Sequence, residues 1–177
     1  MRGAKAWVPA TLVLLLWVAA LLFWYAYARG AQAGQTPRPG PTLSAAQTAV
    51  IQAVKDYYKV TDEVRRTGDV GLVDSVTFSE GSPANVNFRE FMREQEAKSH
   101  HSVVVAEYFK DWTVVVNGDD AIAQYTNWSI GHDTDARTGA AIETDQALSK
   151  SRYRAALRAS QARWLLVTEE RTAENVP

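Results

Sequence analysis

The residues of this 177-residue chain best suited to chemistry are a tyrosine, an aspartate and a histidine that together are able to transfer protons. Tyr58 and Asp62 are four residues apart in a segment with helical periodicity, so we expect both side chains on one face of a helix. His101 follows at an expected junction between a helix and a strand. Residues of these types act as general acid and base when their pKa values are shifted toward neutrality.

Each of the three residues also has an ordinary structural interpretation, which stays open. A tyrosine beside an apolar helical stripe is typical of a core with its hydroxyl at the rim, and a histidine at a junction is typical of a solvated loop. Three further titratable residues on the expected strands are weaker candidates: Glu107, Asp111 and His132.

Metal and covalent chemistry find little support in the sequence. The chain has no cysteine, which excludes disulfides, thiolate metal sites and a cysteine nucleophile. The acidic pairs Asp119-Asp120 and Asp133 with Asp135 fall in expected turns and lack the spacing of a calcium loop. No glycine-rich phosphate loop, HExxH motif or GxSxG motif occurs. We therefore expect neither a metal nor a cofactor.

The balance of charge argues against nucleic acid as a partner. Lysine and arginine number 19 against 20 aspartates and glutamates, a formal net charge of −1 that creates no basic field. Four arginines fall on the expected outer face of the last hairpin and form a candidate surface for a protein partner or acidic lipid: Arg152, Arg154, Arg158 and Arg163. The alternative is a solvated face whose charge Glu169 and Glu170 balance.

Residues 6–28 are uncharged and dominated by leucine, valine, alanine and aromatic residues. As a helix this run is about 35 Å long, enough to cross a hydrocarbon core of about 30 Å. It contains aromatic residues of the kind that anchor a membrane span: Trp7, Trp17, Trp24, Tyr25 and Tyr27. We therefore expect a single-pass anchor that contacts the lipid bilayer through residues 6–28 and places the protein in the cell membrane.

Basic residues before the span favour a cytoplasmic N-terminus. Arg2, Lys5 and the terminal amine precede the run, whereas Arg29 and Arg38 follow it. The positive-inside rule then places the C-terminal domain outside the cytoplasm. Two alternatives stay open, namely a cleaved signal peptide with its cleavage site near residues 31–33 and a buried helix of a soluble domain.

The chain after the cytoplasmic tip and anchor (residues 1–28) divides into a Pro- and Gly-rich linker at 29–43, a globular domain at 44–172 and a tail at 173–177. The expected helices are 44–66, which opens on a capping box of Ser44 and Gln47, 69–75 and 88–98, with a loop at 77–87. The expected strands are 101–116, 120–132, 141–158 and 163–170. This pattern predicts an α+β fold in which three helices precede a four-stranded antiparallel meander.

Three features of this order resemble the nuclear transport factor 2-like superfamily over residues 44–172. They are the paired aromatics Tyr57-Tyr58, the hairpin from Trp112 to Tyr125, which turns at Asn117-Gly118-Asp119, and the last strand with Arg163-Trp164-Leu165. The resemblance implies a cone in which the helices pack on the concave face of a bent sheet. Members of the superfamily use this cone as an isomerase or dehydratase site, as a small-molecule cup or as a dimerising module.

Membrane-anchored versions of this domain are similar to the periplasmic bridging subunits of type IV secretion and conjugation systems. The anchor, the spacer and the lack of a convincing catalytic constellation lead to our first hypothesis, an extracytoplasmic binding or scaffolding module that acts on a protein partner without catalysis. The alternative is a small-molecule isomerase or lyase with Tyr58, Asp62 and His101 around a pocket in the cone. A self-assembling structural subunit is a third hypothesis.

Overall fold

The computed structural model describes residues 42–177. The expected membrane span at 6–28 and nearly all of the linker lie outside these residues. Between residues 42 and 177, no helix has both the length and the apolar character needed to cross a membrane. The described helices are α2 (Ala45–Thr67), the 3-10 helix η1 (Val70–Ser75) and α3 (Pro83–Ala97). The described strands are β1 (His100–Asn117), β2 (Asp120–Asp135), β3 (Gln146–Ala147), β4 (Ser151–Ser160) and β5 (Arg163–Ala173).

Helix α2 begins and ends on the signals that the sequence contains. The Ser44 side chain accepts a hydrogen bond from the Gln47 backbone, and the Gln47 side chain accepts one from the Ser44 backbone, so the expected capping box is confirmed. Gly68 ends the helix with a φ of 78°, a conformation that favours glycine. Asp69 then caps η1 by accepting a hydrogen bond from the Gly71 backbone.

Helix α3 begins earlier than expected. The sequence around residues 77–87 predicts a loop, and the expectation of a helix from 88 is wrong because Pro83 already opens it. Proline at the first helical position costs little stability, because the backbone N–H at that position would have no hydrogen-bond partner within the helix. Ala84, Phe88 and Met92, spaced four residues apart, are buried, and this burial extends the helix back to the proline.

The sheet has five strands, whereas the sequence predicts four. The order is β1-β2-β4-β5, all antiparallel, and the two-residue strand β3 pairs with β2 at Ile130 and Gly131. The expected third strand at 141–158 is wrong in its first half. Residues 139–149 are exposed and offer no buried face to a sheet, so pairing there is limited to β3 and to a single bridge between Ala141 and Thr134.

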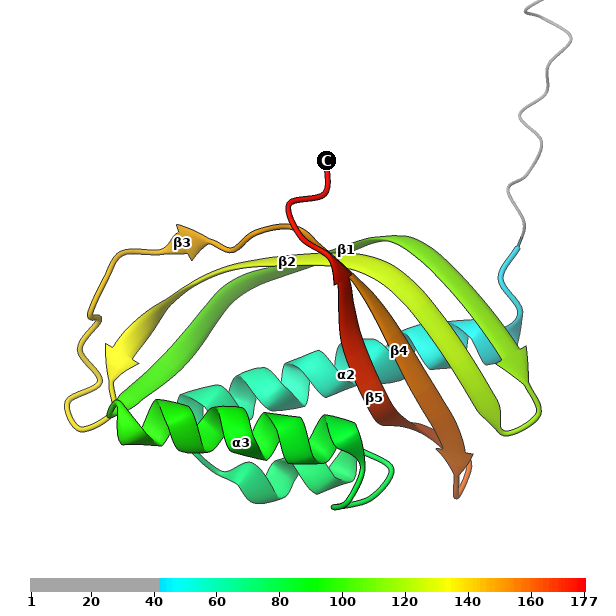
Figure 1. Cartoon of the computed structure of the whole chain (residues 1–177), viewed down its shortest axis with the longest axis horizontal. Helices are drawn as coiled ribbons and strands as arrows, with labels where there is room; N and C mark the ends of the chain where they lie inside the picture. Colours follow the sequence, from blue (N-terminus) through cyan, green and yellow to red (C-terminus); the bar gives the residue numbers. More distant parts are fainter. Residues whose placement is uncertain (1–41) are drawn as a thin grey trace, which may run out of the picture. The chain divides into compact units, whose positions relative to one another are not determined.

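Helices α2 and α3 cover the concave side of the sheet, which the long β1–β2 hairpin bends over them (Figure 1). Strand β1 is kinked by register shifts at Val105 and at Asp111-Trp112. At the first of these, β1 and β2 approach so closely that a Cβ on Gly131 would lie 2.3 Å from the carbonyl oxygen of Val103. Only glycine fits at this position of the bend.

The core lies between α2 and the inner face of β2, β4 and β5. Val50, Val54, Tyr125, Leu157 and Leu166 are almost completely buried there. On β4 the expected alternation is confirmed, because tyrosine, alanine and leucine point inward and the arginines point outward. This packing fills the narrow end of the cone and leaves the wider end open.

Candidate functional site

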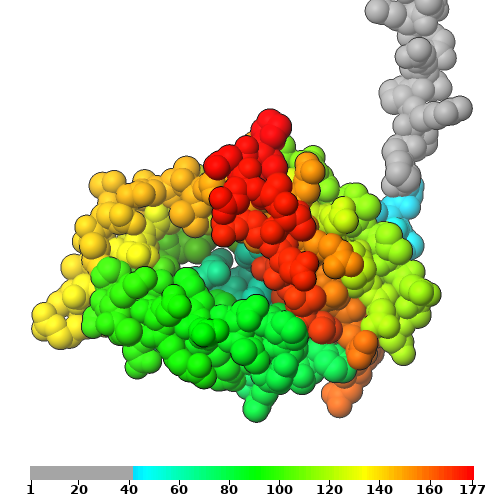
Figure 2. All heavy atoms as spheres, in the orientation of Figure 1, coloured from blue at the N-terminus to red at the C-terminus, as the bar shows by residue number. Residues whose placement is uncertain are grey.

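A cavity of about 290 Å³ lies between α2, α3 and the concave face of the sheet. We call it the cone pocket. In the space-filling view, a hollow opens between α3, the segment around β3 and the C-terminal strand β5, and α2 is visible at its base (Figure 2). Leu148, which is 62% exposed, lies at this mouth. The pocket therefore opens to solvent at the wide end of the cone.

Polar side chains from four elements line the cone pocket. They come from α2, β1, β2 and β5: Arg65, Ser102, Glu107, Asn127, Ser129 and Glu169. Aromatic and aliphatic side chains complete the wall: Tyr57, Tyr58, Phe91, Val104, Leu148 and Tyr153. A lining with aromatic walls and a few converging polar groups is typical of a small-molecule site.

Glu169 lies at the inner end of the pocket. Its carboxylate accepts a hydrogen bond from the Tyr125 hydroxyl, and the hydroxyl oxygens of Tyr125 and Tyr58 are 3.4 Å apart. Burial raises the pKa of Glu169, and the hydrogen bonds from Tyr125 and Tyr58 oppose that rise only in part. Neutral hydroxyls therefore donate to the carboxylate directly, and the charge of Arg65 lowers its pKa without forming an ion pair with it in the described part of the chain.

The expected position of Glu169 on the outer face of the sheet is wrong. Ala156 pairs with Thr168 and Leu157 with Leu166, so Val167 is an unpaired bulge residue. The extra residue shifts the in-out alternation of β5 by one, which turns Glu169 toward the cone. Glu170 keeps the outward position, opposite Arg154.

Glu107 faces the pocket from β1. Its carboxylate accepts a hydrogen bond from the Asn127 side chain at 3.2 Å. Burial and the negative charge of Asp62 together raise the pKa of Glu107 to about 7, against the hydrogen bond from Asn127 and the positive charge of Arg65. At neutral pH the Glu107 carboxyl therefore exists in both protonation states. A general base requires this, and so does a carboxyl that loses its proton when a ligand binds.

Arg65 is the cation that α2 brings to the pocket. Its Nη1 lies 2.6 Å from an oxygen of Asp62, and its guanidinium carbon lies 5.6 Å from the ring centres of both Phe88 and Phe91. Burial raises the pKa of Asp62, and Arg65 opposes that rise. Asp62 and the two phenylalanine rings therefore hold Arg65 in place as one half of an ion pair.

Buried tyrosines form the floor of the pocket. Tyr58 packs edge-on against Tyr125, with ring centres 6.2 Å apart, and Tyr125 stacks on Trp112 at 4.7 Å and on Tyr153 at 5.8 Å. Burial raises the pKa of Tyr57, Tyr58, Tyr125 and Tyr153 above the ordinary value of 10. Their hydroxyls remain protonated at physiological pH and serve as hydrogen-bond donors.

The structure does not bring the three candidate acid and base residues to one place. Tyr58 lines the cone pocket, and Asp62 is paired with Arg65 beside it. His101 lines a separate cavity of about 220 Å³ together with Gly68 and Met92. Of the weaker candidates, Glu107 faces the cone pocket, whereas His132 pairs with Asp145 at 2.6 Å.

Sequence reasoning missed the roles of Glu169, Arg65 and Asn127. Arg65 carried a usable signal, since it lies seven residues after Tyr58 on the same helical face. Asn127 lies two residues after Tyr125 in the same strand. Because side chains alternate between the two faces of a strand, both residues lie on the same face. Glu169 carried no such signal, because the bulge at Val167 reverses the alternation before it.

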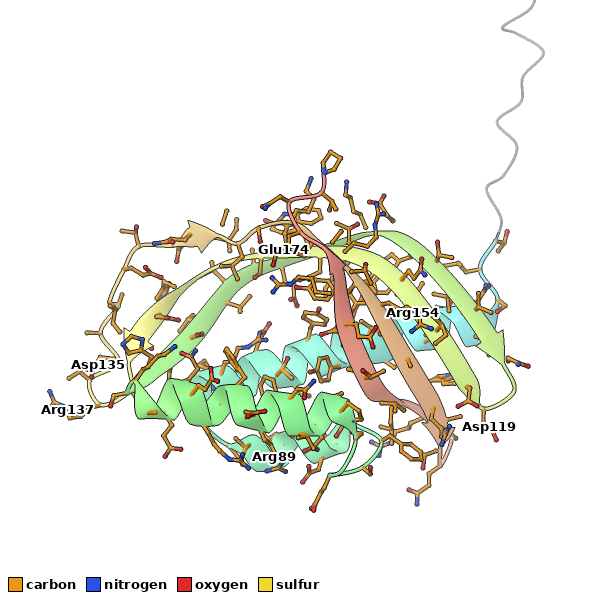
Figure 3. All side chains as sticks on the ribbon, viewed as in Figure 1. Arg89, Asp119, Asp135, Arg137, Arg154 and Glu174 are labelled. Atoms are coloured by element: carbon orange, nitrogen blue, oxygen red, sulfur yellow. The ribbon has the colours of Figure 1, made fainter. Side chains whose placement is uncertain are left out.

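The four candidate partner arginines are exposed on β4 and β5, and Figure 3 labels Arg154 among them. Arg158 is partly engaged, because it pairs with Asp120 at 2.9 Å and lies over the Phe78 ring at 5.2 Å. Arg154 lies opposite Glu170 in the β4–β5 register. In the region from 42 to 177, no group of three histidines, aspartates or glutamates converges as a set of metal ligands.

The sequence matches no protein-family model and no curated protein. Solved structures do match the fold. The intermembrane space region of the chloroplast protein ARC6 aligns with a TM-score of 0.54 and 10% identity, covering 74% of this chain and 98% of that one. A putative Ca/calmodulin-dependent kinase II association domain from Exiguobacterium sibiricum aligns with a TM-score of 0.51 and 11% identity, covering 78% and 99%.

The matches also include an NTF2-like protein with a cystatin-like fold from Novosphingobium aromaticivorans, at a TM-score of 0.44 and 17% identity, covering 70% of this chain and 79% of that one. At such identities a structural likeness shows the fold alone. The helices and the antiparallel sheet of this chain make an α+β fold, and the solved structures that match it include proteins described as NTF2-like.

Proposed function

We propose that this chain is a membrane-anchored, extracytoplasmic binding module of the NTF2-like kind, and that the cone pocket is its binding site for a small molecule. The observation that carries the proposal is the lining of the pocket. Glu107 and Glu169 face one solvent-accessible cavity from β1 and β5, and neither forms an ion pair with another described residue.

A structural role alone gives a poor account of these two carboxylates. Burial raises the pKa of both, which means that their charged forms are less stable in the folded protein than in water. A carboxylate in such a desolvated position costs stability whenever it is ionised. Destabilising polar groups that converge on a cavity are typical of a site that binds a ligand.

The anchor and the compartment are inferred from the sequence. The uncharged run at 6–28 is long enough to span a bilayer, and the Pro- and Gly-rich linker at 29–43 would separate the domain from the membrane surface. The fold likeness to the intermembrane space region of a chloroplast protein is consistent with a domain of this fold outside a membrane.

A fragment screen tests the proposal. The full chain in non-ionic detergent is mixed with small aromatic fragments of positive, neutral and negative charge, and binding is followed by ligand-observed NMR. We expect at least one class to bind. Leu148→Trp places a large side chain at the exposed mouth without disturbing the core, so it should block that binding. Binding that Leu148→Trp leaves unchanged, or no binding in any class, would contradict the proposal.

A small-molecule isomerase or lyase is a second candidate, and Glu107 is the observation that favours it. A carboxylate with a pKa of about 7 is suited to abstract a proton, and the protonated Tyr58 hydroxyl in the same cavity is suited to stabilise an oxyanion. Catalysis would be supported if the chain turns over a bound ligand, and if Glu107→Gln abolishes this turnover while His101→Ala retains it. Retention of turnover in Glu107→Gln would count against it.

A protein partner remains a candidate for the outer face of the sheet. Tyr108 and Trp128 stack there with ring centres 5.2 Å apart, Tyr108 is 43% exposed, and Lys150 lies over the Trp128 ring at 5.4 Å. One of the fold neighbours is a putative association domain, which fits such a use. The test is cross-linking of the full chain to its neighbours in the native membrane. A cross-link to a protein partner that is lost in Trp128→Ala and kept in the exposed control Val115→Ala would support this use. Equal cross-linking in both variants would exclude this face.

A further inference from the structure

Among residues 42–177, no cation forms an ion pair with Glu107 or Glu169, the two carboxylates of the cone pocket. Asn127 donates to Glu107, and Tyr125 donates to Glu169, and both donors are neutral. The nearest guanidinium, that of Arg65, lies 2.6 Å from Asp62 and is neutralised by it. When all of these groups are ionised, three carboxylates therefore face one cation around the pocket.

Aromatic rings form much of the wall between the carboxylates. Tyr57 and Tyr58 come from α2, Phe91 from α3 and Tyr153 from β4. One ring of this wall already contacts a cation, because the Arg65 guanidinium lies 5.6 Å from the centre of Phe91 and equally far from the neighbouring Phe88. The negative face of an aromatic ring attracts organic cations, most strongly where water is excluded.

Resting on the proposed binding function, we infer that the cone pocket selects a small organic cation, an ammonium group attached to an apolar body. Glu107 and Glu169 would supply the counter-charge, and the tyrosine and phenylalanine rings would contact the apolar body. A volume of about 290 Å³ accommodates a ligand about the size of a single aromatic ring with a short side chain.

The opposite charge classes fit this lining poorly. An anionic ligand would face two carboxylates at close range, and the positive charge of Arg65 in the same lining is already balanced by Asp62. A neutral ligand would leave both carboxylates without a counter-charge in a desolvated cavity. An ammonium ligand relieves this cost, and the raised pKa of each carboxyl should fall when the ligand binds.

The test uses three probes of nearly one shape: benzylamine, benzyl alcohol and benzoate. Each is titrated by ligand-observed NMR into the full chain in non-ionic detergent at about pH 8, where benzylamine is mostly charged and Glu107 is mostly ionised. We expect benzylamine to bind at least about tenfold more tightly than benzyl alcohol, with benzoate weakest.

Two variants and one matched control assign the effect to the pocket. Glu107→Gln and Glu169→Gln should each weaken benzylamine binding by roughly tenfold and leave benzyl alcohol unchanged. Asp119→Asn removes a carboxylate from the exposed β1–β2 turn, labelled in Figure 3, and should have no effect. The Tm of each variant verifies that it is folded.

The outcomes separate this inference from the proposed function. If benzoate or benzyl alcohol binds as tightly as benzylamine, or if neither glutamine variant weakens benzylamine, the choice of an organic cation is wrong. If Leu148→Trp still blocks the binding of whichever probe binds, the cone pocket remains the binding site and only the proposed ligand class is wrong. If no probe and no fragment of any charge binds, both the inference and the proposed function fall.

Discussion

The hydroxyl of Tyr125 donates a hydrogen bond to the carboxylate of Glu169, and this pair connects β2 to the middle of β5 across the floor of the cone pocket. Tyr125 is 1% exposed and its ring is fixed by stacking on Trp112 and Tyr153. A buried, stacked donor therefore orients the acidic group that faces the pocket, as second-layer residues do in many binding sites.

Tyr125→Phe should destabilise the domain by about 1–3 kcal/mol, because the Glu169 carboxylate loses its buried donor while the ring stacking stays. The loss should be larger at pH 8 than at pH 5, since the hydrogen bond is strongest to the ionised carboxylate. Urea unfolding at both pH values measures it. Tyr108→Phe removes an exposed hydroxyl and is the matched control; an equal loss in both variants would contradict this account.

Glu107→Gln should stabilise the domain above neutral pH. The pKa of Glu107 rises from an ordinary 4.5 to about 7 on folding, so the folded state binds the proton more tightly than the unfolded state. Stability from this group is therefore fully present below pH 4.5 and is lost as the pH rises to about 7. We expect a Tm increase on the order of 2–5 °C at pH 8 and no increase at pH 4.

Glu80→Gln is the control for that experiment, because Glu80 is an exposed glutamate outside the cone pocket. Its Tm should follow that of the unaltered chain at both pH values. If Glu107→Gln lowers the Tm at pH 8, the Glu107 carboxylate is stabilised by contacts and is not desolvated.

Gly131→Ala should disturb the bend that opens the cone. Its new Cβ would meet the Val103 carbonyl oxygen at 2.3 Å, and backbone must shift to relieve this contact. A cost of about 1–3 kcal/mol is expected from the overpacking. Gly81→Ala, where nothing lies within 4 Å, should have little effect in the same unfolding measurement. Equal stability of the two variants would show that β1 and β2 are not in close contact here.

Leu16→Arg should release the protein from membranes if residues 6–28 span the bilayer. An arginine at the centre of a span costs about 2.5–3.5 kcal/mol on insertion scales. Leu16→Ala is the control, which should remain in the membrane fraction after carbonate extraction of cells that express the full chain. Recovery of the unaltered, uncleaved chain in the aqueous fraction would contradict the anchor.

Local signals explain which features the sequence predicts correctly. The capping box at Ser44, the stop at Gly68 and the tight turn at Gly118, where φ is 59°, depend only on neighbouring residues. The alternation on β4 is also local, because Arg152, Arg154 and Arg158 are polar and the inward residues between them are not. These features do not require knowledge of the tertiary structure.

The pocket depends on contacts that are distant in the sequence. The bulge at Val167 occurs where β5 also pairs with the segment after η1, through a bridge between Leu166 and Thr77. No periodicity within β5 reveals that bridge, so the inward position of Glu169 was not predictable. The start of α3 at Pro83 likewise depends on burial of Ala84 against the rest of the domain.

The pKa of Glu107 tests the central claim that the cone pocket holds desolvated carboxylates that are not paired with a cation. It is measured by NMR titration of the carboxyl carbon in the full chain labelled with 13C-glutamate, with Glu107→Gln to assign the signal. The account predicts a pKa of about 7 in the free protein. A value close to 4.5 would mean that the Glu107 carboxyl is solvated or paired, and it would contradict the account.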